Sequence, residues 1–66
     1  MNEAYLMIDG QKVGVEDQGR GLYQAYVDGD KWLISKRVHD KALKAILAGD
    51  AVALKKALEA SALKAG

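Results

Sequence analysis

The chain falls into two parts that differ in the spacing of their apolar residues. Up to Ser35, apolar and polar residues alternate in short runs, which is the period of a β-strand with one buried face. Beyond Ser35 the chain is rich in Ala, Leu and Lys, and its apolar residues recur three and four positions apart, as in an amphipathic helix. The pattern predicts a sheet over residues 1–35 and helices over residues 36–66.

Two Asp-Gly steps predict turns in the first part. Asp9-Gly10 and Asp28-Gly29 each lie between runs of β-forming residues. A type I′ turn needs positive φ at both central positions, which Gly adopts freely and Asp tolerates. Each step therefore predicts the tip of a β-hairpin. The segment between the hairpins, residues 16–21, has no apolar residue, and we expect a flexible connection there.

A two-residue loop fixes the register of each hairpin and so divides its side chains between two faces. One face collects the residues that we expect in the core: Leu6, Ile8, Val13, Val15, Tyr23, Ala25, Val27, Trp32 and Ile34. The opposite face is mixed and still carries Tyr5, Met7, Leu22, Tyr26 and Leu33. One apolar and one mixed face are typical of an antiparallel sheet that helices cover on one side.

The second part contains the signals of two short helices. Ser35 and Asp40 both have side chains suited to an N-cap, and the expected apolar stripe of the first helix is Ala42, Leu43, Ile46 and Leu47. Gly49-Asp50 then predicts a glycine C-cap followed by the N-cap of a second helix. The alternative is a single long, kinked helix through Gly49, with a narrow stripe that would favour dimerisation. Either way the fold class is α+β, in one domain.

Size and composition restrict the kinds of site. A core built from 66 residues gives only marginal stability. Self-association often adds to the stability of such small domains, so we expect a homodimer. The chain has no Cys and one His, which excludes a disulfide, a thiolate zinc site and a histidine cluster, and we expect no cofactor. No apolar run approaches the roughly 20 residues of a membrane span, and Met1-Asn2-Glu3 provides no basic leader. We expect a cytoplasmic protein with no membrane partner.

Catalysis has few candidate groups. His39 and Asp40 are adjacent, but neighbouring helix residues point about 100° apart and no Ser or Cys nucleophile accompanies them, so we expect His39 on the surface. The acidic pairs at residues 16–17 and 28–30 have the positions of turn residues rather than of metal ligands. We therefore expect a protein that is not an enzyme.

Charge is distributed unevenly along the chain. The formal net charge is +1, but residues 1–30 hold six acidic and two basic side chains, whereas residues 31–66 hold three acidic and eight basic ones. A basic second half permits nucleic-acid binding, in one form through a β-ribbon over residues 32–38 that presents Ser35 and Arg37 to the major groove. The candidate contacts are Ser35, Lys36, Arg37, Lys41 and Lys44.

The hypothesis that we favour is a small protein-binding module, acting as a regulator, inhibitor or adaptor of a larger protein. The mixed sheet face has the Tyr and Met content that interfaces favour, so its candidate contacts are Tyr5, Met7, Tyr26 and Leu33, with Arg20 from the polar connection. Nucleic-acid binding and a purely structural role in an assembly are the alternatives. The acidic first half would repel a phosphate backbone, and the size is typical of small bacterial or phage regulators.

Overall fold

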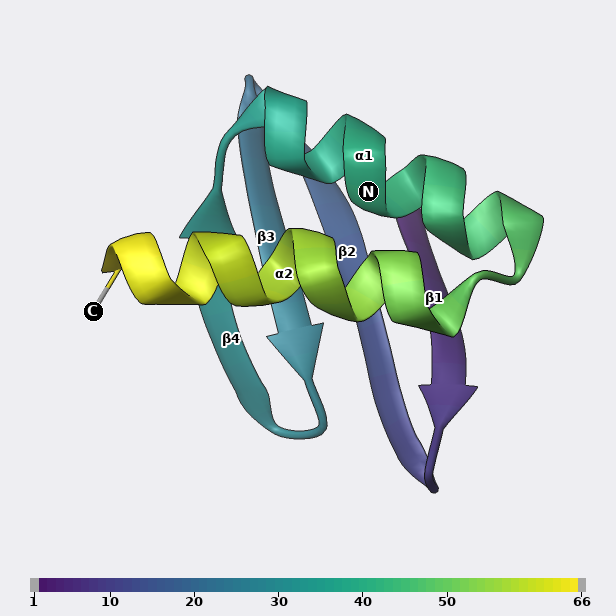
Figure 1. Cartoon of the computed structure of the whole chain (residues 1–66). Coiled ribbons are helices and arrows are strands. Elements are labelled where there is room, and N and C mark those ends of the chain that lie inside the picture. Colours follow the sequence, from purple (N-terminus) through teal and green to yellow (C-terminus); the bar gives the residue numbers. More distant parts are fainter. Residues whose placement is uncertain (1, 66) are drawn as a thin grey trace.

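The computed structural model describes residues 2–65, with side chains through Ser61. Four antiparallel strands form one sheet in the order β1–β2–β3–β4, and two helices follow (Figure 1). The elements are β1 (Asn2–Ile8), β2 (Gln11–Gly19), β3 (Leu22–Val27), β4 (Asp30–Ile34), α1 (Lys36–Ala48) and α2 (Ala51–Ala65). Both helices lie on the same face of the sheet, which confirms the predicted α+β architecture.

The two Asp-Gly turns are present, but they differ in backbone conformation. In the first, Asp9 and Gly10 have φ of 52° and 78°, as a type I′ turn requires. In the second, Asp28 has φ of 58° while Gly29 lies outside the left-handed region. The expectation of a left-handed glycine at this tip is therefore wrong: of the two turn residues, Asp28 alone has a positive φ.

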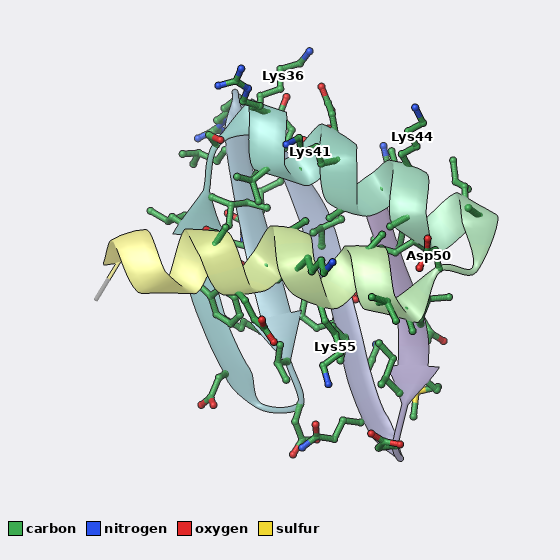
Figure 2. The ribbon with its side chains drawn as sticks, in the orientation of Figure 1. Lys36, Lys41, Lys44, Asp50 and Lys55 are labelled. Atoms are coloured by element: carbon green, nitrogen blue, oxygen red, sulfur yellow. The ribbon has the colours of Figure 1, made fainter. Side chains whose placement is uncertain are left out.

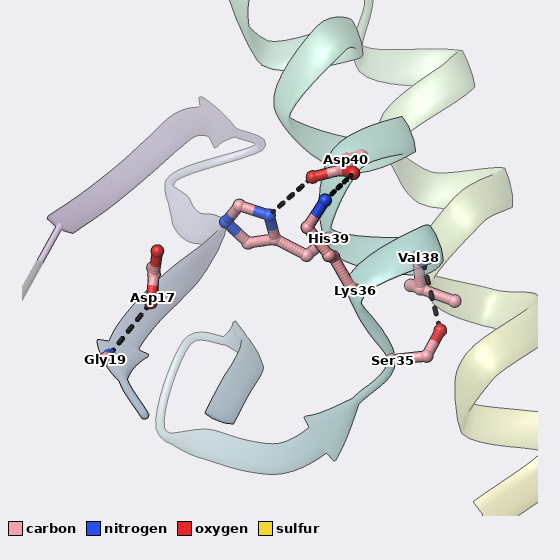
Figure 3. A network of polar contacts seen from close by, with 7 residues as sticks. All are labelled: Asp17, Gly19, Ser35, Lys36, Val38, His39 and Asp40. Atoms are coloured by element: carbon pink, nitrogen blue, oxygen red, sulfur yellow. Dashed lines mark hydrogen bonds and ion pairs between the residues drawn. The ribbon is translucent and has the colours of Figure 1, made fainter. Parts of the chain in front are cut away.

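The polar segment between these turns is ordered as strand and turn, so the expected flexible connection is wrong. β2 continues to Gly19, and Arg20 and Gly21 form a third two-residue turn with φ of 58° and 75°. The register shifts between Asp17 and Gly19, where the Gly19 N–H donates to Asp17 Oδ1 at 2.9 Å (Figure 3). Backbone pairing with β3 thus continues through a segment that has no apolar residue, and the sheet is a four-strand meander.

Side-chain caps begin both helices, and a glycine separates them. Ser35 Oγ accepts the Val38 N–H at 3.2 Å (Figure 3), and Asp50 Oδ1 accepts the Ala53 N–H at 3.0 Å. Gly49 ends α1 in the left-handed region, with φ of 68°. The two-helix prediction is confirmed, and the single long helix is excluded. Within residues 2–65 no helix has the length and apolar character to cross a membrane.

The core lies between the sheet and the helices. Its buried members are Val13, Val15, Ala25, Ala42, Ala45, Ile46, Leu54 and Leu58. The predicted stripe of α1 is wrong at Leu47, which is 79% exposed, because α1 turns Ala45 toward the sheet instead. A small side chain at that position lets the helix backbone approach the strands closely.

His39 is buried, which corrects its expected surface position. It precedes Ala42 and Ile46 by three and seven residues, and therefore lies on the same inward face of α1. Its ring lies 4.6 Å from that of Tyr23, centroid to centroid, and its Nδ1 lies 3.2 Å from Asp40 Oδ1 (Figure 3). This contact, followed by the nearby Lys36 ammonium, lowers the pKa of the Asp40 carboxyl.

The two helices approach the sheet differently. α1 packs directly against β1, β2 and β3, whereas α2 packs chiefly against α1. α2 contributes Leu54 and Leu58 to the core, and its Ser61 Oγ accepts the Trp32 Nε1–H at 3.3 Å. The β1–β2 and β3–β4 turns project beyond α2 (Figure 1), so one end of the sheet extends past the helices.

Candidate functional site

The face of the sheet that points away from the helices, called the outer face below, is formed by alternate residues of all four strands. The register brings Tyr5, Gly14, Tyr26 and Lys31 into one row across the sheet. A second row consists of Glu3, Glu16, Gln24 and Leu33. Because both helices lie on the other face, no described element covers these side chains.

Four large apolar side chains are exposed on the outer face, in two pairs. Tyr5 and Met7 lie on the edge strand β1 and are 47% and 61% exposed. Leu22 of β3 and Leu33 of β4 are 47% and 63% exposed. Tyr5, Met7 and Leu33 lie where the alternation predicts them. Leu22 also lies where the alternation predicts it, and its position and size identify it as a contact that the predicted set lacks.

Tyr26 lies between these pairs and is only 6% exposed, so its predicted role as an exposed contact needs correction. The Lys12 side chain explains the burial, because its Nζ lies 5.6 Å from the centre of the Tyr26 ring and 4.5 Å from that of Tyr5. The same Nζ forms an ion pair with Glu3 at 2.7 Å. Gly14, between the two tyrosines, has no side chain and leaves the space in which they gather.

The hydroxyl of Tyr26 is buried and makes no hydrogen bond with any described side chain or backbone group. It lies beside a shallow hollow of about 140 Å³ that Glu3, Glu16 and Lys31 also line. Burial, followed by the nearby Glu3 carboxylate, raises the pKa of Tyr26 far above its usual range. The centre of the outer face therefore contains a buried, uncharged hydroxyl beside the Glu3 carboxylate.

Charged groups around this centre are held in their ionised forms. Contact with the Lys12 ammonium lowers the pKa of Glu3, and contact with Glu3 raises the pKa of Lys12. Beside them, Gln18 Nε2 donates to Gln24 Oε1 at 2.7 Å and to Glu16 Oε1 at 3.1 Å. The centre of the outer face is a hydrogen-bonded polar network between two apolar pairs, as in interfaces that combine apolar anchors with polar contacts.

Arg20 is the last of the predicted protein contacts. It is exposed in the β2–β3 turn, two residues before Leu22, and so lies at one end of the outer face. The structure brings it near one apolar pair only.

The nucleic-acid candidates lie on the helical side of the molecule. Ser35 is the N-cap of α1, and Lys36, Lys41 and Lys44 project from that helix (Figure 2). Arg37 is also exposed on it. β4 ends at Ile34, so the predicted β-ribbon over residues 32–38 does not exist, because the cap at Ser35 starts a helix there. Lys36 also pairs with Asp40 at 3.5 Å. The two sets of candidate contacts thus occupy opposite sides of the sheet.

Neither metal sites nor known relatives add to this picture. In the part of the chain that the structure describes, no three His, Cys, Asp or Glu side chains are grouped as metal ligands would be. No protein-family model, curated protein or solved structure matches the chain. The functional interpretation therefore depends on the exposed surfaces themselves.

Proposed function

We propose that this chain is a small protein-binding module that regulates, inhibits or adapts a larger protein by covering part of its surface with the outer face. In this proposal it catalyses no reaction itself. The observation that supports it is the exposure of Tyr5, Met7, Leu22 and Leu33 on the sheet face that the helices leave uncovered.

The energetics favour a protein as the occupant of this face. Full burial of a large apolar side chain stabilises a complex by about 1.5–3 kcal/mol, and four such side chains are available. The polar network between them offers hydrogen-bonding groups, among them the side chains of Gln18 and Gln24. A protein surface supplies both apolar anchors and polar partners, whereas a phosphate backbone would meet Glu3 and Glu16 at the centre of the face.

A homodimer also belongs to the proposal: in the absence of the larger protein a second copy of the chain occupies the outer face, and the two compete for it. Association of two copies through the outer face would bury the same apolar pairs. Nucleic-acid binding would instead use the exposed basic residues of α1, on the opposite side. The two functions therefore make different predictions for the same set of variants.

The test begins by locating the contact surface in the native host. A photo-crosslinking amino acid is placed at Met7 or at Leu33, and in a control chain at Leu47, which is also exposed but lies on α1. Extracts are treated with nuclease before the crosslinked products are identified by mass spectrometry. We expect one protein to crosslink from Met7 and Leu33 and not from Leu47.

Affinity for that purified protein is then measured for Tyr5→Ala, Met7→Ala and Leu33→Ala, with Leu47→Ala and Val52→Ala as controls of matched exposure. We expect at least about a tenfold loss for one or more outer-face variants, through faster dissociation and with modest salt dependence. Binding to DNA or RNA that weakens steeply with salt, is lost in Arg37→Ala and is unchanged in Leu33→Ala would contradict the proposal.

The cytoplasmic location is checked by fractionating host cells.

A further inference from the structure

A cavity of about 350 Å³ opens at the end of the sheet that projects beyond α2. The partly or fully buried residues that line it are apolar: Ile8, Val13, Val27, Trp32 and Leu58. The exposed residues at its mouth are polar: Asp9, Gln11, Asp30, Lys55 and Glu59. We call this space the tip cavity. It lies on the opposite face from the proposed protein contact and is independent of it.

The tip cavity follows from how α2 is held. α2 packs against α1 and approaches the sheet only through side chains such as Leu58, so it covers the apolar face of the hairpin tips incompletely. The bond from Trp32 Nε1 to Ser61 Oγ fixes the indole at one wall. Engineered apolar cavities of about 150 Å³ bind benzene, so the tip cavity has room for a larger apolar group.

The mouth of the tip cavity has an excess of negative charge. Asp9, Asp30 and Glu59 contribute three carboxylates, whereas Lys55 contributes one ammonium group (Figure 2). Among the described side chains, none of these four forms an ion pair. Unpaired carboxylates around an apolar interior favour a ligand that joins an apolar body to a cationic group, and disfavour an anion.

We infer that the tip cavity binds a small organic cation, with its aliphatic or aromatic body against Trp32 and Leu58 and its protonated amine between Asp30 and Glu59. The apolar body gains from leaving water, and the amine exchanges hydration for the carboxylates at the mouth. Such a ligand would bridge the hairpin tips and α2, which the fold otherwise leaves apart.

The test uses n-octylamine, n-octanol and octanoate, three probes with the same chain and different head groups. Trp32 is the single tryptophan, so selective excitation of its fluorescence reports occupancy of the tip cavity directly. At neutral pH and low salt we expect saturable binding of the amine about tenfold tighter than that of the alcohol, with octanoate the weakest. Methyl resonances of Ile8, Val27 and Leu58 should shift, while those of Leu33 on the outer face should not.

The double variant Asp30→Asn, Glu59→Gln tests the assigned charge. Both residues are exposed, so the variant is expected to fold, which thermal melting checks. We expect it to lose most of the preference for the amine while its affinity for octanol is unchanged, and Glu16→Gln on the outer face to retain that preference. Absence of saturable binding, equal affinity for amine and alcohol, or shifts confined to the outer face would each overturn the inference.

Discussion

At the scale of single residues, the absence of a side chain at Gly14 allows β1 to lie close to β2 at the centre of the sheet. A Cβ built on it would overlap the Ala4 carbonyl oxygen and lie 2.6 Å from Tyr5 Cβ. Neither is the end of a flexible side chain, so strand β1 itself would have to move. The close approach of β1 and β2 therefore depends on glycine at this position, and the packing of Tyr5 and Lys12 over Tyr26 depends on it in turn.

We expect Gly14→Ala to lower the free energy of unfolding by about 2–3 kcal/mol, because the added methyl group must displace backbone. Urea denaturation followed by circular dichroism measures the change. Gly29→Ala is the matched control, since a Cβ there meets no atom within 4 Å and its φ is not left-handed. Its effect should stay within about 0.5 kcal/mol. Equal losses in the two variants would contradict this account.

Tyr26 makes the stability of the folded protein depend on pH in the alkaline range. Its pKa is raised in the folded protein above the ordinary value of about 10, so the folded state holds the proton more tightly than the unfolded state does. The resulting stabilisation is complete below about pH 10 and is lost as the pH rises further. We expect Tyr26→Phe to reduce the fall in stability above pH 10 while changing stability at neutral pH little.

The measurement is urea denaturation of the natural chain and Tyr26→Phe at several alkaline pH values, with the tyrosinate absorbance recorded in the folded state. Tyr5→Phe is the control, because Tyr5 is half exposed. The same alkaline loss in the natural chain and in Tyr26→Phe would show that other groups cause it.

At the scale of elements, local signals set where each strand and helix ends. Two-residue turns close all three β-hairpins, and residues with positive φ occupy each of them. Ser35 and Asp50 satisfy backbone N–H groups at the two helix starts. The Gly49 N–H and the Asp50 N–H return to carbonyl groups of the last turn of α1, which is the Schellman arrangement.

The helical hairpin should therefore be sensitive to the side chain at position 49. We expect Gly49→Ala to lower the free energy of unfolding by about 1–2 kcal/mol, because an alanine with φ near 68° is strained. Gly49→Asn should cost less, since asparagine tolerates the left-handed region. Urea denaturation of both variants measures the difference. Alanine performing as well as glycine would indicate that the helices join differently.

At the scale of the whole molecule, the two faces of the sheet differ in what covers them. The inner face packs against the helices and contains most of the core, while the outer face retains exposed apolar pairs. The basic residues of α1 lie on the helical side. A molecule that approaches the outer face thus meets apolar pairs and a polar network, whereas one that approaches the helical side meets a basic surface.

The small core and the exposed outer face lead us to expect a homodimer at micromolar concentration. Sedimentation equilibrium should then give twice the chain mass of 7.1 kDa. The double variant Met7→Lys, Leu33→Lys should sediment as a monomer, while Leu47→Lys should still dimerise. The monomer mass for the natural chain throughout this range would contradict the expectation.

Much of the outer face was predictable, because alternation along a strand needs only local geometry. Tyr5, Met7 and Leu33 are exposed where the register of the hairpins places them. The burial of Tyr26 was not predictable in this way, since it depends on Lys12 reaching across from β2 toward Glu3 on β1. The tip cavity could not be predicted from the sequence either, because it arises from the spacing between α2 and the sheet.

The sequence by itself determined the two Asp-Gly hairpins, the helical second half and the faces of the strands, because turns, caps and apolar periodicity act between residues close in the chain. Asp9-Gly10, Ser35 and Gly49-Asp50 are local signals of this kind. Only the tertiary structure decided that α1 turns Ala45 and His39 inward and leaves Leu47 exposed. Such choices follow from how closely two surfaces approach, and that distance is set by side chains far apart in the chain.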